Sequence, residues 1–127
     1  MKIGILKETQ KGEKRVSISP DIAKKFIDKG FEVMVEDDAG SSSSYKNSDY
    51  EDVGVTVEAR GVVYKEADIL VKINPFDEED LKLVDDHHIL MSQLFHKSHP
   101  ELIKAIGEKG ATAFSMDAMP RISRAQD

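Results

Sequence analysis

The sequence has no cysteine and few cations relative to its acids. Without cysteine, disulfide bonds, thiolate catalysis and cysteine metal sites are excluded within this chain. The 18 lysines and arginines face 24 acidic residues, which gives a net charge of -6, and the cations form no cluster. Because nucleic-acid affinity depends on concentrated positive charge, we expect no nucleic-acid partner.

Long hydrophobic runs and nucleotide-binding glycine motifs are also missing. Apolar runs such as Ile69–Val71 and Ile89–Met91 are far shorter than the roughly 20 residues of a membrane-spanning helix, so we expect a soluble chain. Neither GxGxxG nor GxxxxGK[ST] occurs. The chain therefore lacks the glycine turn that lets backbone amides approach a pyrophosphate, and a complete nucleotide site is not expected in it.

Six short apolar runs recur along the chain and predict strands. They are Ile3–Leu6, Val33–Val35, Val55–Val57, Ile69–Ile73, Ile89–Leu94 and Ala111–Phe114. Segments with helix start signals separate them. The predicted helices begin near Ser19, Ser48, Gly61, Asp77 and Ser98.

This alternation predicts one α/β domain over residues 1–127, built on a doubly wound, mainly parallel sheet with helices on both faces. Both the flavodoxin-like and the Rossmann-like forms of such a sheet are compatible with the pattern. Ligands of these folds bind beyond the carboxyl ends of the strands, which directs attention to the segments that follow them.

Several candidate sites have an ordinary structural interpretation. Arg15 could hold a carboxylate or phosphate, but pairing with Glu8 or Glu13 is the favoured interpretation. The acidic run Asp77–Asp80 could hold a cation, yet it fits a solvated helix start better. The four histidines lack a convergent set of acidic partners, and adjacent strand residues point to opposite faces, so we assign no metal. They are His87, His88, His96 and His99.

The segment Pro120–Gln126 has two cations, a hydroxyl and an amide after the last predicted strand. These groups offer donors for phosphate, and the amide can pair with a nicotinamide carboxamide. From the residues alone, a plain amphipathic helix remains the favoured interpretation.

Read together, several segments resemble the N-terminal domain shared by alanine dehydrogenase and the transhydrogenase alpha subunit. The matching segments are Lys2–Thr9 (KIGILKET), Glu13–Val16 (EKRV), Ser19–Pro20, Gly30–Val33 (GFEV) and Asp117–Gln126 (DAMPRISRAQ). The last is similar to the transhydrogenase loop that contacts NAD(H), and this resemblance reverses the amphipathic-helix interpretation. The cofactor-binding residues that it implies are Arg121, Ile122, Ser123, Arg124 and Gln126. The family's loop aspartate lies three residues beyond the glutamine, so Asp127 is not given that role.

Chemistry separates the two branches of the family. The alanine dehydrogenase pattern has a lysine after the fourth strand and a histidine after the fifth, because the enzyme binds a carboxylate and moves protons. Asn74 and Phe95 stand at those positions here, with His96 one place further on. Hydride exchange between two nicotinamides needs no acid or base in the transfer step, which favours the transhydrogenase branch. An alanine dehydrogenase domain remains the alternative.

The resemblance implies a larger protein. A glycine-rich NAD domain is expected outside this chain, and NADP(H) and the proton channel are expected on membrane and NADP(H)-binding domains or subunits. It also implies a homodimer and a cytoplasmic protein peripheral to a membrane complex, with no catalytic side chain in this fragment and no activity for the fragment alone.

A signalling receiver or other flavodoxin-like binding module is an alternative from another class. A receiver needs paired acids after the first strand and an aspartate after a central one. Glu8 stands alone and Asn74 follows the fourth strand, so the residues disfavour it.

Overall fold

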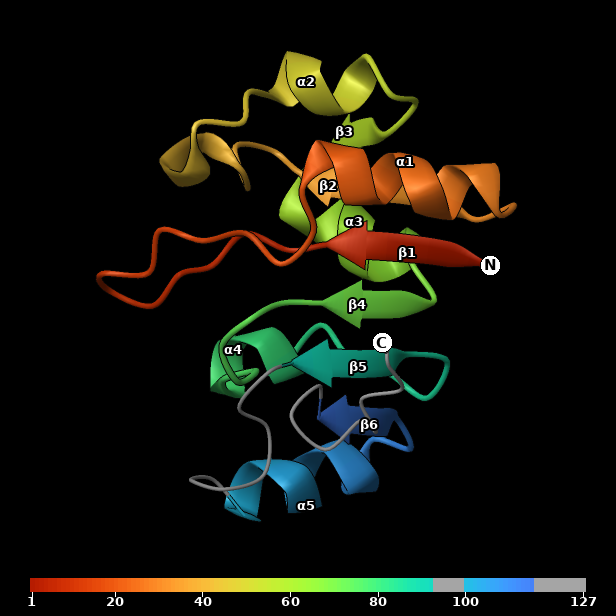
Figure 1. Cartoon of the computed structure of the whole chain (residues 1–127). Coiled ribbons are helices and arrows are strands. Elements are labelled where there is room, and N and C mark those ends of the chain that lie inside the picture. Colours follow the sequence, from red (N-terminus) through yellow and green to blue (C-terminus); the bar gives the residue numbers. More distant parts are fainter. Residues whose placement is uncertain (93–99, 116–127) are drawn as a thin grey trace, which may run out of the picture.

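The computed structural model describes residues 1–92 and 100–115, in which strands alternate with helices (Figure 1). The strands are β1 (Lys2–Ile5), β2 (Glu32–Glu36), β3 (Thr56–Glu58), β4 (Ile69–Val71), β5 (Ile89–Ser92) and β6 (Thr112–Ser115). The helices are α1 (Pro20–Asp28), α2 (Asn47–Glu51), α3 (Arg60–Glu66), α4 (Glu78–Leu81) and α5 (Pro100–Glu108), with a 3-10 helix η1 (Ser41–Ser43). Each predicted apolar run overlaps one of the strands.

The strands form one parallel sheet in the order β3-β2-β1-β4-β5-β6. This is the Rossmann order and differs from the flavodoxin order, so the structure decides between the two predicted forms. The order reverses between β1 and β4. A cleft for ligands is expected at this switch point, beyond the carboxyl ends of the strands.

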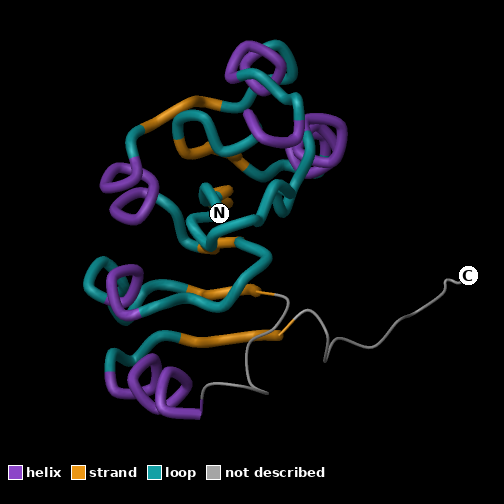
Figure 2. Tube along the Cα trace, turned by 90° about the vertical axis from the view of Figure 1, so that its left-hand side faces the viewer, coloured by secondary structure: helices purple, strands orange, loops and turns teal. Residues whose placement is uncertain are grey.

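Helices cover both faces of the sheet, as predicted (Figure 2). Alternate residues of each strand point to opposite faces, so neighbours such as Ile3 and Gly4 belong to different layers. One core lies beneath α1 and α2 and includes Ile5, Val35 and Tyr50. The other lies beneath α3, α4 and α5 and includes Leu70, Leu90 and Ile106.

Helix α1 begins where its sequence predicts. Ser19 caps it by accepting a hydrogen bond from the Ile22 amide at 3.4 Å, and Pro20 occupies the first position. Gly30 follows the helix with a φ of +99°, a conformation that favours glycine. Within the described residues, no helix is long and apolar enough to cross a membrane.

Helix α2 corrects the prediction that Ser48 caps it. The helix begins at Asn47, and the Asp49 carboxylate accepts a hydrogen bond from the Lys46 amide at 2.8 Å. The start is fixed by a distant contact, because the Asn47 side chain donates to Asp37 at 2.6 Å and accepts from the Asp38 amide at 3.0 Å. A capping pattern, which compares residues three positions apart, cannot predict that contact.

Close packing of α3 on β1 depends on Gly4. A β-carbon at this position would lie 2.7 Å from Cγ1 of Val63 and 2.8 Å from Cβ of Ala67. We expect Gly4→Ala to lower the free energy of unfolding by about 1–3 kcal/mol, because this interface has no room to expand. Urea denaturation would measure the change.

Gly61 provides the matched control for that substitution. It lies in α3, and a β-carbon there would meet no atom within 4 Å. Gly61→Ala should leave stability unchanged or raise it by up to about 1 kcal/mol. Equal effects of the two substitutions would contradict the importance of the Gly4 contact.

Candidate functional site

The candidate site lies at the switch point, where the segments after β1 and β4 meet. In Figure 1 the loop that follows β1 extends past the tips of the strands, on the side where α4 lies. Two carboxylates of this loop, Glu8 and Glu13, contact the segment after β4. They determine the geometry of this edge of the sheet.

Glu8 joins the two segments through hydrogen bonds to backbone amides. Its carboxylate accepts from the amides of Ile73 at 2.7 Å and Asn74 at 3.1 Å, and from Nδ2 of Asn74 at 3.2 Å. Hydrogen bonds to an ionised acceptor are stronger than neutral ones. The residues after β4 are therefore held at the end of β1.

Glu13 joins Asn74 to Arg15. Its carboxylate accepts from Nδ2 of Asn74 at 2.9 Å and from two guanidinium nitrogens of Arg15, each at 2.9 Å. The hydrogen bonds from Arg15, followed by that from Asn74, lower the pKa of Glu13 to about 2. Arg15 is thus paired with Glu13, as its ordinary structural interpretation predicts.

A buried network of charged side chains lies beneath this edge, and the sequence patterns did not predict it. Lys72 and Asp80 are 2% and 0% exposed, and their side chains form an ion pair at 3.0 Å. Arg60 also pairs with Asp80 and lies 3.6 Å from a carboxylate oxygen of Glu36. A lysine inside the apolar run Ile69–Ile73 was the available indication, because a charge buried in a strand needs a partner.

The interpretation of Asp77–Asp80 as a solvated helix start is correct for three of its residues and wrong for Asp80, which is buried. Asp77 does cap α4, accepting from the Asp80 amide at 2.8 Å, and Glu78 and Glu79 are exposed. Asp80 instead points inward. Burial opposes ionisation of its carboxyl group, but the Lys72 ammonium, the Asp77 amide and Arg60 together lower its pKa.

Glu36 differs from Asp80 although both belong to the network. Its carboxylate lies at the end of β2 and accepts from the Lys7 amide at 3.0 Å. Burial raises the pKa of Glu36, and the Lys7 amide and the Arg60 charge only partly oppose this effect. Arg60 does not contact it as closely as it contacts Asp80.

A pocket of about 250 Å³ opens at the switch point. Lys72, Asn74 and Phe76 contribute its buried residues, and Thr9, Gln10 and Asp77 are its exposed ones. Pro75 completes the lining. The pocket thus lies between the two segments that Glu8 joins, at the place where the fold predicts a ligand.

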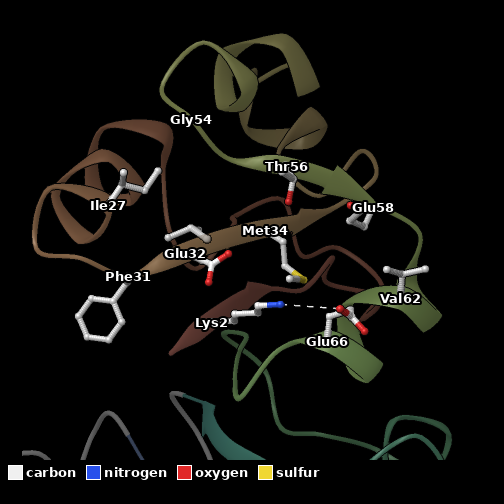
Figure 3. A pocket seen from close by; sticks show the side chains of 11 residues that line it. Lys2, Ile27, Phe31, Glu32, Met34, Gly54, Thr56, Glu58, Val62 and Glu66 are labelled. Atoms are coloured by element: carbon white, nitrogen blue, oxygen red, sulfur yellow. Dashed lines mark ion pairs between the residues drawn. The ribbon is translucent and has the colours of Figure 1, made fainter.

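A larger groove of about 400 Å³ lies on the face of the sheet beside α3 (Figure 3). Met34 points into it, and Lys2 and Glu66 form an ion pair of 3.8 Å across it. Both of these charged side chains are more than one-third exposed, so the pair contributes little. The groove lies away from the carboxyl edge at the switch point, and we do not assign it chemistry.

The positions of His87 and His88 show that one argument against metal binding was wrong, namely that adjacent histidines point to opposite faces of a strand. The rings of His87 and His88 lie 3.9 Å apart and do not point to opposite faces, because both residues precede β5. Together with Asp85 they bring three potential ligands into one cluster. However, Nδ1 of the buried His88 accepts from the Asp85 amide at 2.9 Å, and Nε2 contacts the Tyr64 carbonyl. Ligation by His88 would break one of these bonds.

The other predicted positions are not placed. Phe95, His96 and His99 lie outside the described residues. So do all five expected cofactor-binding residues: Arg121, Ile122, Ser123, Arg124 and Gln126. Among the predicted positions that the structure describes, Arg15 and Asn74 meet at the switch point through the acids around them, and His87 lies beside His88 before β5.

Comparisons with known proteins match this domain along nearly its full length. The family model described as "Alanine dehydrogenase/PNT, N-terminal domain" matches residues 4–127. NAD(P) transhydrogenase subunit alpha of Haemophilus influenzae is 32% identical, covering 99% of this chain and 24% of that protein. Alanine dehydrogenase 1 of Staphylococcus aureus (strain Mu50) is 29% identical, covering 99% of this chain and 34% of that protein.

A solved structure agrees with these relatives. The transhydrogenase from Sinorhizobium meliloti superimposes with a TM-score of 0.91 and 31% sequence identity, covering 99% of this chain and 38% of that one. The chain thus spans well under half of the length of each of these proteins.

The buried ion pair gives a prediction about stability. Lys72→Met should lower the free energy of unfolding by about 3–5 kcal/mol, because it leaves a buried carboxylate with one cation fewer. Lys72→Met combined with Asp80→Asn should cost less than the sum of the two single substitutions. The control is Lys82→Ala, whose exposed pair with Glu79 should contribute less than about 1 kcal/mol. An equal cost at positions 72 and 82 would contradict the role of the pair.

The burial of His88 predicts that the free energy of unfolding falls as the pH drops below neutral. Burial is the main reason that its pKa lies below the ordinary 6.5, so the unfolded chain takes up this proton before the folded chain does. The contribution of His88 is complete above about pH 6.5 and falls as the pH drops towards its folded pKa. Between pH 7.5 and 5, the wild type should lose more unfolding free energy than His88→Gln does. Parallel losses in urea titrations would contradict this assignment.

Proposed function

The chain belongs to the alanine dehydrogenase/PNT N-terminal domain family, and from that premise we propose that it lies in the NAD(H)-binding component of a proton-translocating NAD(P) transhydrogenase. Such an enzyme exchanges hydride between NAD(H) and NADP(H). Because the chain spans well under half of its relatives, the activity is proposed for a longer protein.

The remaining portions of this enzyme are proposed to lie outside the chain. A glycine-rich domain would supply most contacts to NAD(H), since GxGxxG is absent here. NADP(H) and the proton path would belong to NADP(H)-binding and membrane domains or subunits. We also propose that the component forms a homodimer and lies on the cytoplasmic side of the complex.

The observation that carries the proposal is Asn74. In the alanine dehydrogenase pattern a lysine occupies this position, where it can contribute to carboxylate binding and proton transfer. A carboxamide has no charge to balance a substrate carboxylate and no proton to transfer at neutral pH. Glu8 and Glu13 accept hydrogen bonds from Asn74, which fixes it beside the pocket.

This arrangement fits hydride exchange better than amino-acid oxidation. Transfer between two nicotinamides requires that the rings be held close together, dry and correctly faced, and needs no general acid or base. Among the described residues, the contacts that hold the segment after β4 in place support the proposal. Glu8 fixes the segment after β4, and the ion pair of Lys72 with Asp80 fixes its base.

The residues expected to contact the nicotinamide remain those of the segment after β6. They are Arg121, Ile122, Ser123, Arg124 and Gln126. Since β4 and β6 are parallel strands of one sheet, their carboxyl ends lie at the same edge. The end of β6, at Ser115, therefore lies at the edge of the sheet where the switch-point pocket opens.

The test uses the longer protein that contains this chain, together with its NADP(H)-binding partner. We expect hydride exchange between NADPH and an NAD analogue, followed by absorbance, and no oxidation of alanine. The isolated chain should bind NADH only weakly in calorimetry. NAD-dependent turnover of alanine without hydride exchange would establish the dehydrogenase alternative.

Two substitutions in the same assay test the expected contacts. Arg121→Ala and Gln126→Ala should slow hydride transfer by roughly ten- to a hundredfold, corresponding to about 1.5–3 kcal/mol in the transition state, while weakening NADH binding less. Lys104→Ala, at an exposed position of α5, is the control. Stopped-flow transfer rates that match the control in both variants would remove this assignment.

A further inference from the structure

A cluster of titratable side chains lies away from the switch point, in the turn that leads into β5. Asp85, His87 and His88 each offer one ligand atom, and these atoms all lie within 4.8 Å of one another. The turn precedes the amino end of β5, so it lies at the edge of the sheet opposite to the arrowheads of the strands in Figure 1. The cluster is therefore separate from the pocket that the proposed function uses.

The hydrogen bonds of His88 indicate which of its ring nitrogens carries the proton. Nε2 faces the carbonyl oxygen of Tyr64, which can only accept, so the proton is assigned to Nε2. Nδ1 accepts from the Asp85 amide at 2.9 Å and therefore has the lone pair. Nδ1 also lies 3.6 Å from Oδ1 of Asp85. Histidines that bind metals commonly donate their other ring N–H to a backbone carbonyl, as His88 does to Tyr64.

His87 is oriented by a second backbone carbonyl. Its Nε2 lies 3.2 Å from the oxygen of Ala67, and its Nδ1 contacts Oδ1 of Asp85. A neutral imidazole has one N–H, so it can donate to only one of these two oxygens. When Nε2 donates to Ala67, the lone pair of Nδ1 faces the carboxylate, and a cation between them removes the repulsion. A proton can use only one imidazole, whereas a metal ion can also use the lone pair of His88.

Ligation by His88 costs one hydrogen bond between neutral groups. Nδ1 has a single lone pair, so an ion that binds there releases the Asp85 amide. Asp85 lies in an exposed turn, where water can take over that amide. The loss is small beside the free energy of metal coordination. The side chains of His87 and Asp85 are 39% and 60% exposed, which gives an ion a path of entry and leaves a position for water.

We propose that Asp85, His87 and His88 form a site for a divalent transition-metal ion, with Zn²⁺ as the expected ligand. Two imidazole nitrogens and a carboxylate oxygen are a set that binds Zn²⁺ with water in the fourth position. The two rings also connect the turn to Tyr64 in α3 and to Ala67 after it, so a bound ion holds the start of β5 against the end of α3. The proposal revises the expectation of no metal and does not depend on the proposed function.

Calorimetry and NMR of the isotope-labelled chain test the site with ZnCl2 as the probe. One Zn²⁺ should bind with a dissociation constant of about 1–100 μM, weaker than at structural sites with four protein ligands. The ring signals of His87 and His88 should report ligation through Nδ1. The midpoint of thermal unfolding should rise by about 5 °C or more when the free ion is at a hundredfold its dissociation constant. MgCl2 should have no such effect, because Mg²⁺ prefers oxygen ligands.

Substitutions separate this cluster from the other histidines and acids. His87→Gln should weaken Zn²⁺ binding by at least about tenfold, because it removes an exposed ligand while the buried ring stays in place. Asp85→Asn should also weaken binding, and Asp86→Asn, at the adjacent exposed acid outside the cluster, is the matched control. The double variant His96→Gln/His99→Gln should bind like the wild type. Circular dichroism would show that all of these variants fold.

Three results would overturn the site. The first is the absence of Zn²⁺ binding to the wild-type chain, and the second is equal binding of Mg²⁺. The third is binding that survives His87→Gln or is lost in the His96→Gln/His99→Gln variant, because the ion would then lie elsewhere. Hydride exchange in the longer protein is measured separately, so failure of the metal site leaves the proposed function standing.

Discussion

The side chain of Asp80 is inaccessible to solvent, yet it carries a charge that three elements share. Lys72 at the end of β4 and Arg60 at the start of α3 both pair with it, and it accepts a hydrogen bond from the Asp77 amide before α4. Taking such charges out of water costs several kcal/mol each unless the partners are correctly placed. Helices α3 and α4 can therefore pack on β4 only in arrangements that keep these contacts. Lys72 and Asp77 also line the pocket, so their contacts with Asp80 fix part of its wall.

The cations near the carboxyl edge are paired with acids of the chain itself. Arg15 is paired with Glu13, and Lys72 and Arg60 are paired with Asp80. A site that binds a carboxylate substrate usually offers a cation whose counter-ion is the substrate itself, often through a bidentate pair. Here the chain's own acids fill that role. The neutral Asn74 adds no cation to this edge, and it instead donates hydrogen bonds to the carboxylates of Glu8 and Glu13.

The sequence was sufficient for the strands but not for their order. Apolar runs and the Ser19-Pro20 start are local patterns, and the structure confirms them. The Rossmann order, the Asn47 contact that begins α2 and the inward turn of Asp80 depend on residues far apart in the chain. Likewise, the face to which a histidine points depends on where β5 begins. Of the candidate site, the sequence identified Arg15 and Asn74 but not Lys72, because a lysine within an apolar run gives no information about its partner.

The first connection of the sheet explains how a Rossmann order can exist without a glycine-rich phosphate turn after β1. In dinucleotide-binding domains a tight glycine turn after β1 brings a helix N-terminus to the pyrophosphate. Here a long loop separates β1 from α1, and Gly12, with a φ of +85°, allows it to turn back towards the sheet. The loop thus brings Glu8 and Glu13 to the segment after β4, in place of a row of free amides. Strand order sets where the cleft lies, and the loop decides that carboxylates and a neutral amide, rather than phosphate-binding groups, define it.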